Sequence, residues 1–474
     1  MDEELVSNNV KKEEAEFKRS VSRQVVLGLL TNFSSIAPSM SLGFSAVAIP
    51  VLKKTLTEEE VSWFASIASL AAPFGCFFSG PIADRFGRRT AMFCVNVTCF
   101  FGWLLLAVAY HAKESQCALL LLGRVITGFS MGLSSAPATI YMAEISSSKL
   151  RGVFTTWGSI SFSLGVLVVY TLGFILKDSW GTISLITATL PFVGIVIISY
   201  FVPESPTWLV GKNRLEEARD SMCSIFGTKT YTFQVQTELE NIINVKIPKN
   251  YTRRKTLLEQ MLRKVKYLLE PHCLKPFWLL LTYFLFQQFS GTFVIVFYAI
   301  DIVKKAGVTL DPYLTIVLIG VTRMLTAATG GDLCRCYPEP AWPFVCWCWD
   351  LTTGSISEEK IPLDMHAKLT FLPLVMLLLY FATSTLGFLP LPFAIAAEVF
   401  PTKIRGTATG LLSGCGYFFN FVTVKIYPDM AEAMGRDGVF FFYGSVAFLG
   451  TIFVIYLLPE TKGEKFAGDS GILW

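Results

Sequence analysis

The chain has 474 residues, of which 53% are hydrophobic and only 16% are charged, and its mean hydropathy is +0.52. Soluble globular proteins carry about 25% charged residues, so this composition excludes a soluble enzyme, a disordered scaffold and a nucleic-acid-binding module. A helix that crosses a bilayer needs about 20 apolar residues, and the hydrophobic positions could therefore form up to about twelve crossings. The net charge of +4 is small, so its placement along the chain is more informative than its size.

The chain divides into two apolar blocks separated by a polar linker. Residues 1–22 mix Glu and Lys without the apolar core of a signal peptide, which predicts a solvated tail. Six apolar runs of sufficient length follow within 23–210, at about 25–50, 61–80, 91–110, 117–142, 153–175 and 182–202. The stretch 211–272 is rich in Lys, Arg and Glu and is a predicted linker. Five further runs lie within 273–463, at about 274–300, 312–330, 370–397, 407–428 and 438–458, before a second tail at 464–474. The pattern predicts an all-α membrane protein.

Positive charges in short loops indicate which loops face the cytosol. They precede the first run and follow the second, fourth and sixth runs, and they recur after the run at 370–397 and after the last run. Both chain ends and the linker are therefore predicted to be cytosolic. Eleven runs cannot place both ends on one side, so a twelfth crossing is required between Gly331 and Lys368.

The segment 332–368, where that crossing should lie, is atypical. Within 333–351 the chain has three prolines, together with Arg335 and Glu339, and both features oppose a spanning helix. We expect the ninth helix to be aberrant or missing. A frame error is one hypothesis, because the codons that must encode 346–350 read as apolar residues when shifted by one or two bases. A metal site is disfavoured, because the four cysteines here lack the spacing of structural zinc ligands. These cysteines are Cys334, Cys336, Cys346 and Cys348.

Short motifs recur at matching positions in the two halves. After the second run stands Gly-Pro-Ile-Ala-Asp-Arg-Phe-Gly-Arg-Arg at 80–89. An acidic residue followed by Arg-Gly comes after the fourth run (Glu144, then Arg151) and again after the run at 370–397 (Glu398, then Arg405). Pro-Glu-Ser at 203–205 is echoed by Pro-Glu-Thr at 459–461. This repetition predicts two related six-helix halves.

With these motifs in this order, the chain resembles the sugar porters of the major facilitator superfamily. The resemblance implies two six-helix bundles around a central cavity that opens alternately to each side. It also implies that cytosolic charges hold each bundle when the transporter faces outward. In the first bundle these are Asp84, Arg85, Arg88, Arg89, Glu144, Arg151 and Glu204, and in the second they are Glu398, Arg405 and Glu460.

The run Gln-Gln-Phe-Ser-Gly at 287–291 is the most informative of the intramembrane segments. Amides in the middle of a span are costly unless they face a cavity or a partner. The resemblance implies that the substrate-binding residues are Gln287, Gln288, Phe393, Asn420 and Tyr298. Helix packing remains an alternative role for Asn420 and for Phe393.

Other positions depart from the glucose porters. Ser159 and Phe293 stand where glucose porters often have a glutamine and an asparagine, which argues against a glucose-like binding mode. The short first outer loop and the segment Glu-Val-Phe-Pro-Thr-Lys at 398–403 look most like the insect trehalose-transporter subgroup. Ser45 occupies the place where proton-driven sugar symporters of the family carry a carboxylate, which favours facilitated diffusion.

Arg124 and Arg323 are the ionisable residues deepest in apolar runs, and each is expected to face protein or water rather than lipid. A role of Arg323 in the cavity is a hypothesis at this point. The predicted function is uniport of a sugar, trehalose or a hexose, across the plasma membrane by a monomer with no cofactor, metal or nucleic acid. A non-transporting sugar sensor, a non-functional product and a carrier of another organic solute remain alternatives. An enzyme is not expected, because the three histidines lie apart from any acid and nucleophile.

Overall fold

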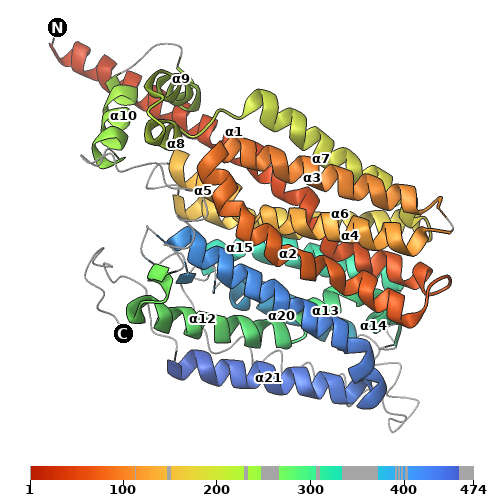
Figure 1. The fold of residues 1–474 in the computed structure, drawn as a ribbon. Helices are drawn as coiled ribbons and strands as arrows, with labels where there is room; N and C mark the ends of the chain where they lie inside the picture. The colour runs from red at the N-terminus through yellow and green to blue at the C-terminus, as the bar shows by residue number, and fades with distance from the viewer. Residues whose placement is uncertain are drawn as a thin grey trace.

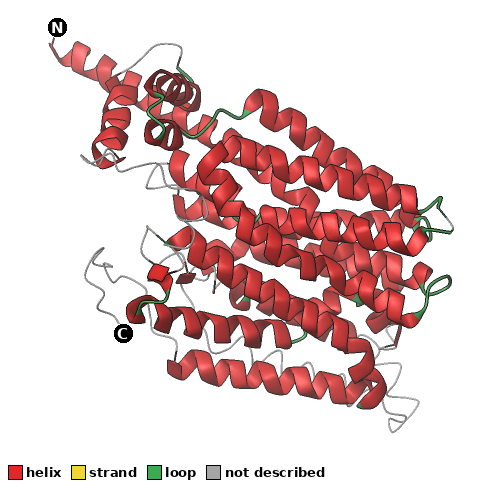
Figure 2. Cartoon of the chain, in the orientation of Figure 1, coloured by secondary structure: helices red, strands yellow, loops and turns green. Residues whose placement is uncertain are grey.

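The computed structural model describes most of the chain, and every element that it describes is helical (Figure 2). The residues that it leaves out are 1, 113, 147–150, 229–232, 247–265, 306–309, 334–371, 390–391, 393–394, 397–398, 401–403 and 458–474. Several predictions therefore lie outside the described residues: those for 334–368, Phe393, Glu398 and Glu460.

The first half of the chain forms a bundle of long, closely packed helices (Figure 1). They are α1 (Asp2–Leu52), α2 (Glu58–Phe86), α3 (Arg88–Ala109), α4 (Gln116–Leu133), α5 (Pro137–Ile145), α6 (Arg151–Leu176) and α7 (Trp180–Phe201). Within this bundle α2 packs on α4, α3 packs on α4 and α7, and α1 packs on α6. Because α4 and α5 continue one another as a single apolar span, these helices make six crossings, as predicted.

Three short helices follow at one end of the bundle, which we call the α9 end. They are α8 (Pro206–Gly211), α9 (Leu215–Phe226) and α10 (Phe233–Lys246), and they lie beside the first part of α1 (Figure 1). We call the opposite end of the molecule the far end. There Thr57 begins α2 with a capping box: its hydroxyl accepts from the Glu60 N–H at 3.3 Å, and the Glu60 carboxylate accepts from the Thr57 N–H at 2.9 Å.

The second half forms another helical bundle. Its elements are α12 (Pro271–Phe289), α13 (Thr292–Phe297), α14 (Ala299–Lys305), α15 (Pro312–Leu333), α18 (Leu372–Thr383), the π-helical turn η1 (Ser384–Phe388), α20 (Arg405–Ala433) and α21 (Gly435–Leu457). The predicted run 274–300 is one span in the sequence but is broken in the structure. Gly291 has φ +85°, a conformation that ends a right-handed helix and that residues with a Cβ rarely adopt, so α12 stops and α13 starts anew.

The two bundles meet along two pairs of helices. Helix α2 of the first half packs on α20, and α6 packs on α15. The broken segment α13–α14 also contacts α1. Side chains that project from α2, α6, α15 and α20 into this contact therefore lie between the bundles.

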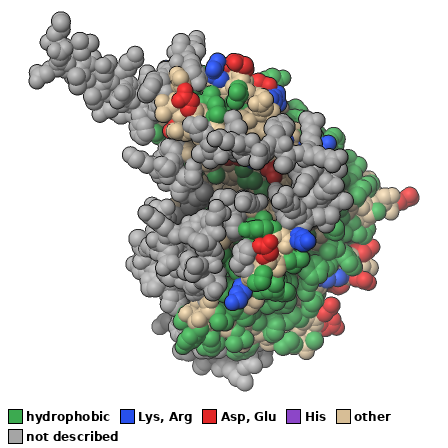
Figure 3. Space-filling model, turned by 60° about the vertical axis from the view of Figure 1, so that its left-hand side comes forward, with side chains coloured by type: hydrophobic (Ala, Val, Ile, Leu, Met, Phe, Trp, Pro, Cys, Tyr) green, Lys and Arg blue, Asp and Glu red, His purple; other side chains and the backbone are tan. Residues whose placement is uncertain are grey.

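The outer flank of the molecule is apolar (Figure 3). Large side chains such as Phe74, Phe192 and Ile455 are more than half or about half exposed. Soluble monomers rarely expose apolar patches larger than a few hundred Å². In the described part of the chain, eight helical segments are long and apolar enough to cross a bilayer. The protein is thus a multi-pass membrane protein.

Candidate functional site

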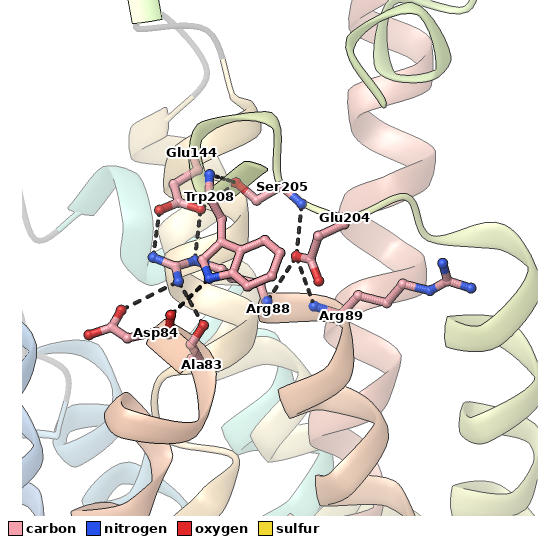
Figure 4. Close-up of polar contacts among 8 residues, drawn as sticks. All are labelled: Ala83, Asp84, Arg88, Arg89, Glu144, Glu204, Ser205 and Trp208. Atoms are coloured by element: carbon pink, nitrogen blue, oxygen red, sulfur yellow. Dashed lines mark hydrogen bonds and ion pairs between the residues drawn. The ribbon is translucent and has the colours of Figure 1, made fainter. Parts of the chain in front are cut away.

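The predicted charges of the first half gather at the α9 end, around Arg88 (Figure 4). The Arg88 guanidinium donates to both oxygens of Glu144, from Nε at 3.0 Å and from Nη2 at 2.9 Å. Its Nη1 donates to the Ala83 carbonyl at 2.8 Å and to Asp84 at 3.4 Å. Arg88 is 7% exposed, so this bidentate pair is partly desolvated and stronger than a surface ion pair.

Glu204 caps the start of α3. One of its carboxylate oxygens accepts from the backbone N–H groups of Arg88 at 2.8 Å, Arg89 at 3.2 Å and Ser205 at 2.9 Å. The first N–H groups of a helix have no intrahelical partner and carry partial positive charge, so a carboxylate there is favourable. Gly87, just before α3, permits this approach. It has φ +102°, and a Cβ on it would lie 2.1 Å from the Glu204 carboxylate.

Neighbouring residues attach this cluster to α7 and α8. Arg89 donates from Nε to the Ile198 carbonyl at 3.1 Å and from Nη2 to the Ser199 carbonyl, near the end of α7. Trp208 donates from its indole to the Asp84 carbonyl at 2.9 Å, and Ser205 donates to Glu144. The Pro-Glu-Ser motif at 203–205 indicated a role for Glu204 alone, and the contacts of Ser205 and Trp208 were not predicted.

The predicted set is brought together only in part. Asp84, Arg88, Arg89, Glu144 and Glu204 form one cluster, here called the N-bundle cluster. Arg85 lies outside it: its side chain is exposed, with the guanidinium 5.3 Å from the Phe86 ring. Arg151 and Arg405 lie at the first positions of α6 and α20, and the structure describes only their backbone.

The predicted intramembrane amides form a network between the bundles. Asn420 on α20 donates to the Gln288 side-chain oxygen at 3.1 Å, and its own oxygen accepts from Ser69 of α2 at 2.6 Å. Gln287 donates to the Leu389 carbonyl at 3.2 Å. All three amide residues are buried. We call Gln287, Gln288 and Asn420 the amide network, and its contact with Ser69 joins the two halves of the chain.

Hydroxyl groups surround the helix break next to this network. The Ser290 hydroxyl donates to the Gln287 carbonyl at 2.8 Å, and Tyr380 of α18 donates to the Ser290 carbonyl at 3.1 Å. The hydroxyls of Tyr380 and Thr292 are 2.7 Å apart. Tyr298 is placed differently from these groups: its buried ring packs on Tyr427, with centroids 4.8 Å apart.

Arg124 of α4 is fully buried in the first bundle, with a complete set of oxygen partners. Its Nη2 donates to the Ser45 hydroxyl at 2.7 Å, its Nη1 to the Ser41 hydroxyl at 2.9 Å, and its Nε to the Phe64 carbonyl at 3.1 Å. The Phe64 ring lies 5.1 Å from the guanidinium. The charge is therefore dispersed over neutral oxygens and a ring face, without any carboxylate.

Arg323 of α15 is buried to the same degree, at 2% exposure, but its Nε and Nη1 have no hydrogen-bond partner. The face of the Phe381 ring lies 5.8 Å from its guanidinium. From the sequence, a cavity role was a hypothesis for Arg323 and not for Arg124, although each is a single cation in an apolar run. The two arginines share their residue type and burial and differ in whether the protein provides oxygen partners.

At the far end, three lysines join the two bundles. Lys53, after α1, pairs with Asp301 of α14 at 2.9 Å, and Lys177, after α6, pairs with Asp311 at 2.7 Å. The hydrogen bond from Lys177 holds the pKa of Asp311 below its ordinary value of 3.8. The third lysine, Lys425 of α20, donates to the Ser62 hydroxyl of α2 at 3.2 Å. We call these three contacts the far-end clasp, and sequence reasoning did not find it.

No cluster of three or more His, Cys, Asp or Glu residues that could hold a metal ion occurs among the described residues. The polar groups found between the bundles are instead amides, hydroxyls and one guanidinium. Such groups bind a polar organic molecule by hydrogen bonds.

Comparisons with known proteins agree with this architecture. The family model described as "Sugar (and other) transporter" matches residues 6–332 and 344–468. Its interruption at 333–343 lies inside the segment that the sequence marks as atypical. Among relatives, the facilitated trehalose transporter Tret1 of Apis mellifera ligustica is 27% identical over 95% of this chain and 88% of its own length. The Tret1-2 homolog of Drosophila simulans is 28% identical, over 93% of this chain and 89% of its own length.

Solved structures share the fold. The proton:xylose symporter XylE bound to 6-bromo-6-deoxy-D-glucose superimposes with a TM-score of 0.74 at 17% identity, covering 94% of this chain and 98% of that one. The inward-open conformation of XylE from E. coli gives a TM-score of 0.71 at 18% identity, covering 95% and 98%. The family match covers most of the chain, and the fold is that of the major facilitator superfamily. The chain therefore belongs to the sugar transporter family of that superfamily, and its relatives include the insect facilitated trehalose transporters.

Proposed function

We propose that this protein is a facilitative uniporter that carries a sugar, trehalose or a hexose, across the plasma membrane by alternating access. In this proposal the α9 end and both chain ends face the cytosol, and the far end faces outward. The two bundles are 23–210 and 273–463, with 211–272 as the cytosolic linker.

The amide network is the observation that carries the proposal. Gln288 and Asn420 offer both donors and acceptors, which suit the hydroxyl groups of a sugar. They lie between the bundles, and the Asn420–Ser69 contact at 2.6 Å crosses from one bundle to the other. A sugar that replaces such contacts on entering would change the relative stability of the two bundle arrangements, which is what alternating access requires.

The far-end clasp supports a particular state for this conformation. Its three contacts bring α14, α20 and the segment before α15 against the first bundle at the proposed outer side. The central site would then be reached from the cytosol. The N-bundle cluster would serve the opposite state by presenting a fixed cytosolic surface to the second bundle, on which Glu398, Arg405 and Glu460 are the proposed counterparts.

Uniport rather than proton symport is supported by the surroundings of Arg124. A proton-coupled site needs a buried acid that titrates during the cycle. Here the guanidinium is held by Ser45 and Ser41 hydroxyls and by carbonyl oxygens. Among the described residues no Asp or Glu is buried. We therefore propose that an imposed pH gradient does not drive uptake.

Counterflow into proteoliposomes that contain the purified full chain tests the proposal. We expect labelled trehalose or glucose to accumulate, and Gln287→Ala to reduce the rate by about tenfold, because one lost hydrogen bond to the substrate costs about 1–1.5 kcal/mol. The matched control is Gln236→Ala, which removes a glutamine on α10 whose amide bonds to Glu240 at 2.8 Å. Sugar binding without counterflow would indicate a sensor, and the absence of both would contradict any sugar function.

A further inference from the structure

Arg323 lies in the middle of the membrane-spanning region, between the bundles. It is eleven residues after the start of α15 at Pro312, which corresponds to about 16 Å along a helix and about half of a ~30 Å hydrocarbon core. Helix α15 packs on α6 of the first bundle and on α18 and η1 of the second. One turn before Arg323, a Cβ on Gly320 would lie 3.0 Å from the Leu167 side chain of α6. The arginine thus lies one helical turn from a tight contact between the two halves.

A buried guanidinium cannot escape its charge by losing a proton, because its pKa is too high. It must be satisfied by oxygen atoms or by a counter-ion, or it lowers the stability of the fold. Arg124 shows that this protein can satisfy a buried arginine with its own oxygens. Arg323 has no such partners on Nε and Nη1, although it is equally inaccessible to bulk water.

The surroundings of Arg323 provide an aromatic ring and a second buried polar group that lacks a partner. Phe381 presents its ring to the charge, with the ring centroid 5.8 Å from Cζ. Thr385 lies four residues further along the same helical segment, in the π-helical turn that contacts α15, and its hydroxyl also lacks a hydrogen-bond partner. Side chains four residues apart share a helix face, and π-helical turns often occur at functional sites. Two polar side chains without partners thus belong to segments that pack on one another.

Among the described residues, no acidic side chain forms an ion pair that would compensate the charge of Arg323. The two acids nearest to the start of α15 are engaged at the far end, Asp301 by Lys53 and Asp311 by Lys177. A short series of contacts connects Arg323 to the amide network instead. Phe381 contacts Tyr380, with ring centroids 5.5 Å apart, and Tyr380 donates to the Ser290 carbonyl. Ser290 in turn donates to the Gln287 carbonyl.

From these observations we infer that Arg323 is a specificity-determining residue that binds an anionic group of the transported molecule. This inference rests on the proposed function, a carrier of a sugar, and makes an acidic sugar the preferred substrate over neutral trehalose or a neutral hexose. The amide network would bind the hydroxyl groups while the guanidinium fork binds a carboxylate or a phosphate through two parallel N–H···O bonds. Thr385 would donate a third hydrogen bond to the same group.

Binding measurements on the purified full chain test this inference. The probes are glucuronate and gluconate for a carboxylate, glucose 6-phosphate for a phosphate, glucose and trehalose as neutral sugars, and acetate as an anion without hydroxyls. We expect glucuronate or gluconate, or alternatively glucose 6-phosphate, to bind at least about tenfold more tightly than glucose, since a charge-assisted bidentate contact gives at least that factor. The probe that binds most tightly shows whether the recognised anionic group is a carboxylate or a phosphate.

Arg323→Gln should abolish the preference and leave the binding of neutral sugars within about twofold. Lys54→Gln is the charge-matched control, because it removes one cation from an exposed position outside the bundle contact, and it should retain the preference. If glucuronate, gluconate and glucose 6-phosphate bind no more tightly than glucose, or if Arg323→Gln keeps their advantage, the inference is wrong.

The same experiment separates this inference from the proposed function. Transport of neutral sugars that depends on Gln287, without any preference for acidic ones, would overturn the inference and leave the sugar carrier intact. Acetate binding that depends on Arg323 and equals that of glucuronate would overturn it as well, because hydroxyl groups would then play no part. Binding of no sugar at all would overturn both.

Discussion

Arg124 and Arg323 are two fully buried arginines, one in each bundle, and the protein treats them differently. Arg124 donates to oxygens from α1 and α2 and has an aromatic ring on one side. Arg323 has the ring but lacks oxygen partners on two of its nitrogens. Burial and residue type are the same in the two cases, so neither decides what a buried charge does. The difference lies in whether the surrounding helices provide oxygen atoms, and it separates a structural arginine from one that is available to a ligand.

The largest effect is expected when this pair is replaced by methionine. Arg124→Met should lower the free energy of unfolding by about 3 kcal/mol or more, because buried acceptors left unpaired cost about 1–3 kcal/mol each. Arg323→Met should leave stability unchanged or raise it, since replacing a poorly compensated buried charge by an apolar side chain is often stabilising. Thermal unfolding of both variants in the same detergent, without ligand, measures the contrast. Equal destabilisation would mean that Arg323 is held by contacts of its own.

A smaller loss is expected in the N-bundle cluster, where the protein again satisfies its own charges. Gly87→Ala places a side chain where φ is +102° and where the Cβ would meet the Glu204 carboxylate. Backbone strain of this kind costs about 1–3 kcal/mol, and displacing the carboxylate from the helix start adds to it. Gly158→Ala on α6 is the matched control, because a Cβ there meets nothing within 4 Å. If both variants unfold at the same temperature, the cap contributes nothing.

The sequence alone predicted the fold and much of the N-bundle cluster. Hydropathy is sufficient to find α2, α3 and α7, since each is a continuous apolar helix, and the motifs with Arg88, Glu144 and Glu204 mark turns that come together at one end. Both signals are local in the chain. The break at Gly291 was not predicted. A glycine in an apolar run can also lie within an unbroken helix, and only its φ in the structure shows that the helix ends there.

Contacts between distant segments could not be predicted. Arg124 and Arg323 look alike in sequence, since each is a single cation in an apolar run, and the distinguishing oxygens come from other helices. The far-end clasp could not be predicted for the same reason, because Lys177 and Asp311 are separated by 134 positions in the sequence. The distribution of charges along the chain indicates which side of the membrane a loop faces. It does not indicate which residue a charged side chain pairs with.

The smallest effect is expected at the far-end clasp, where charges pair in partly exposed positions. The side chains of Lys177 and Asp311 are 53% and 35% exposed, so the pair contributes at most about 0.2–1 kcal/mol to the closed state. Lys177→Gln should therefore increase the opening of the far end only a few-fold. Hydrogen exchange of the turns at 53–57 and 177–179 measures this, with Arg214→Gln, which removes an exposed cation at the α9 end, as the control.

The pH dependence of the clasp follows from the direction of the shift. Lys177 lowers the pKa of Asp311, so the carboxylate favours the closed state at any pH above the ordinary carboxyl value. That contribution is lost only as the pH falls through the lowered pKa. Exchange at the far end should hence be independent of pH between about 5 and 8 once it is corrected for the intrinsic rate. If the opening changes within that range, another group titrates there. Closure of the far end would then depend on that group and not on the exposed pair of Lys177 and Asp311.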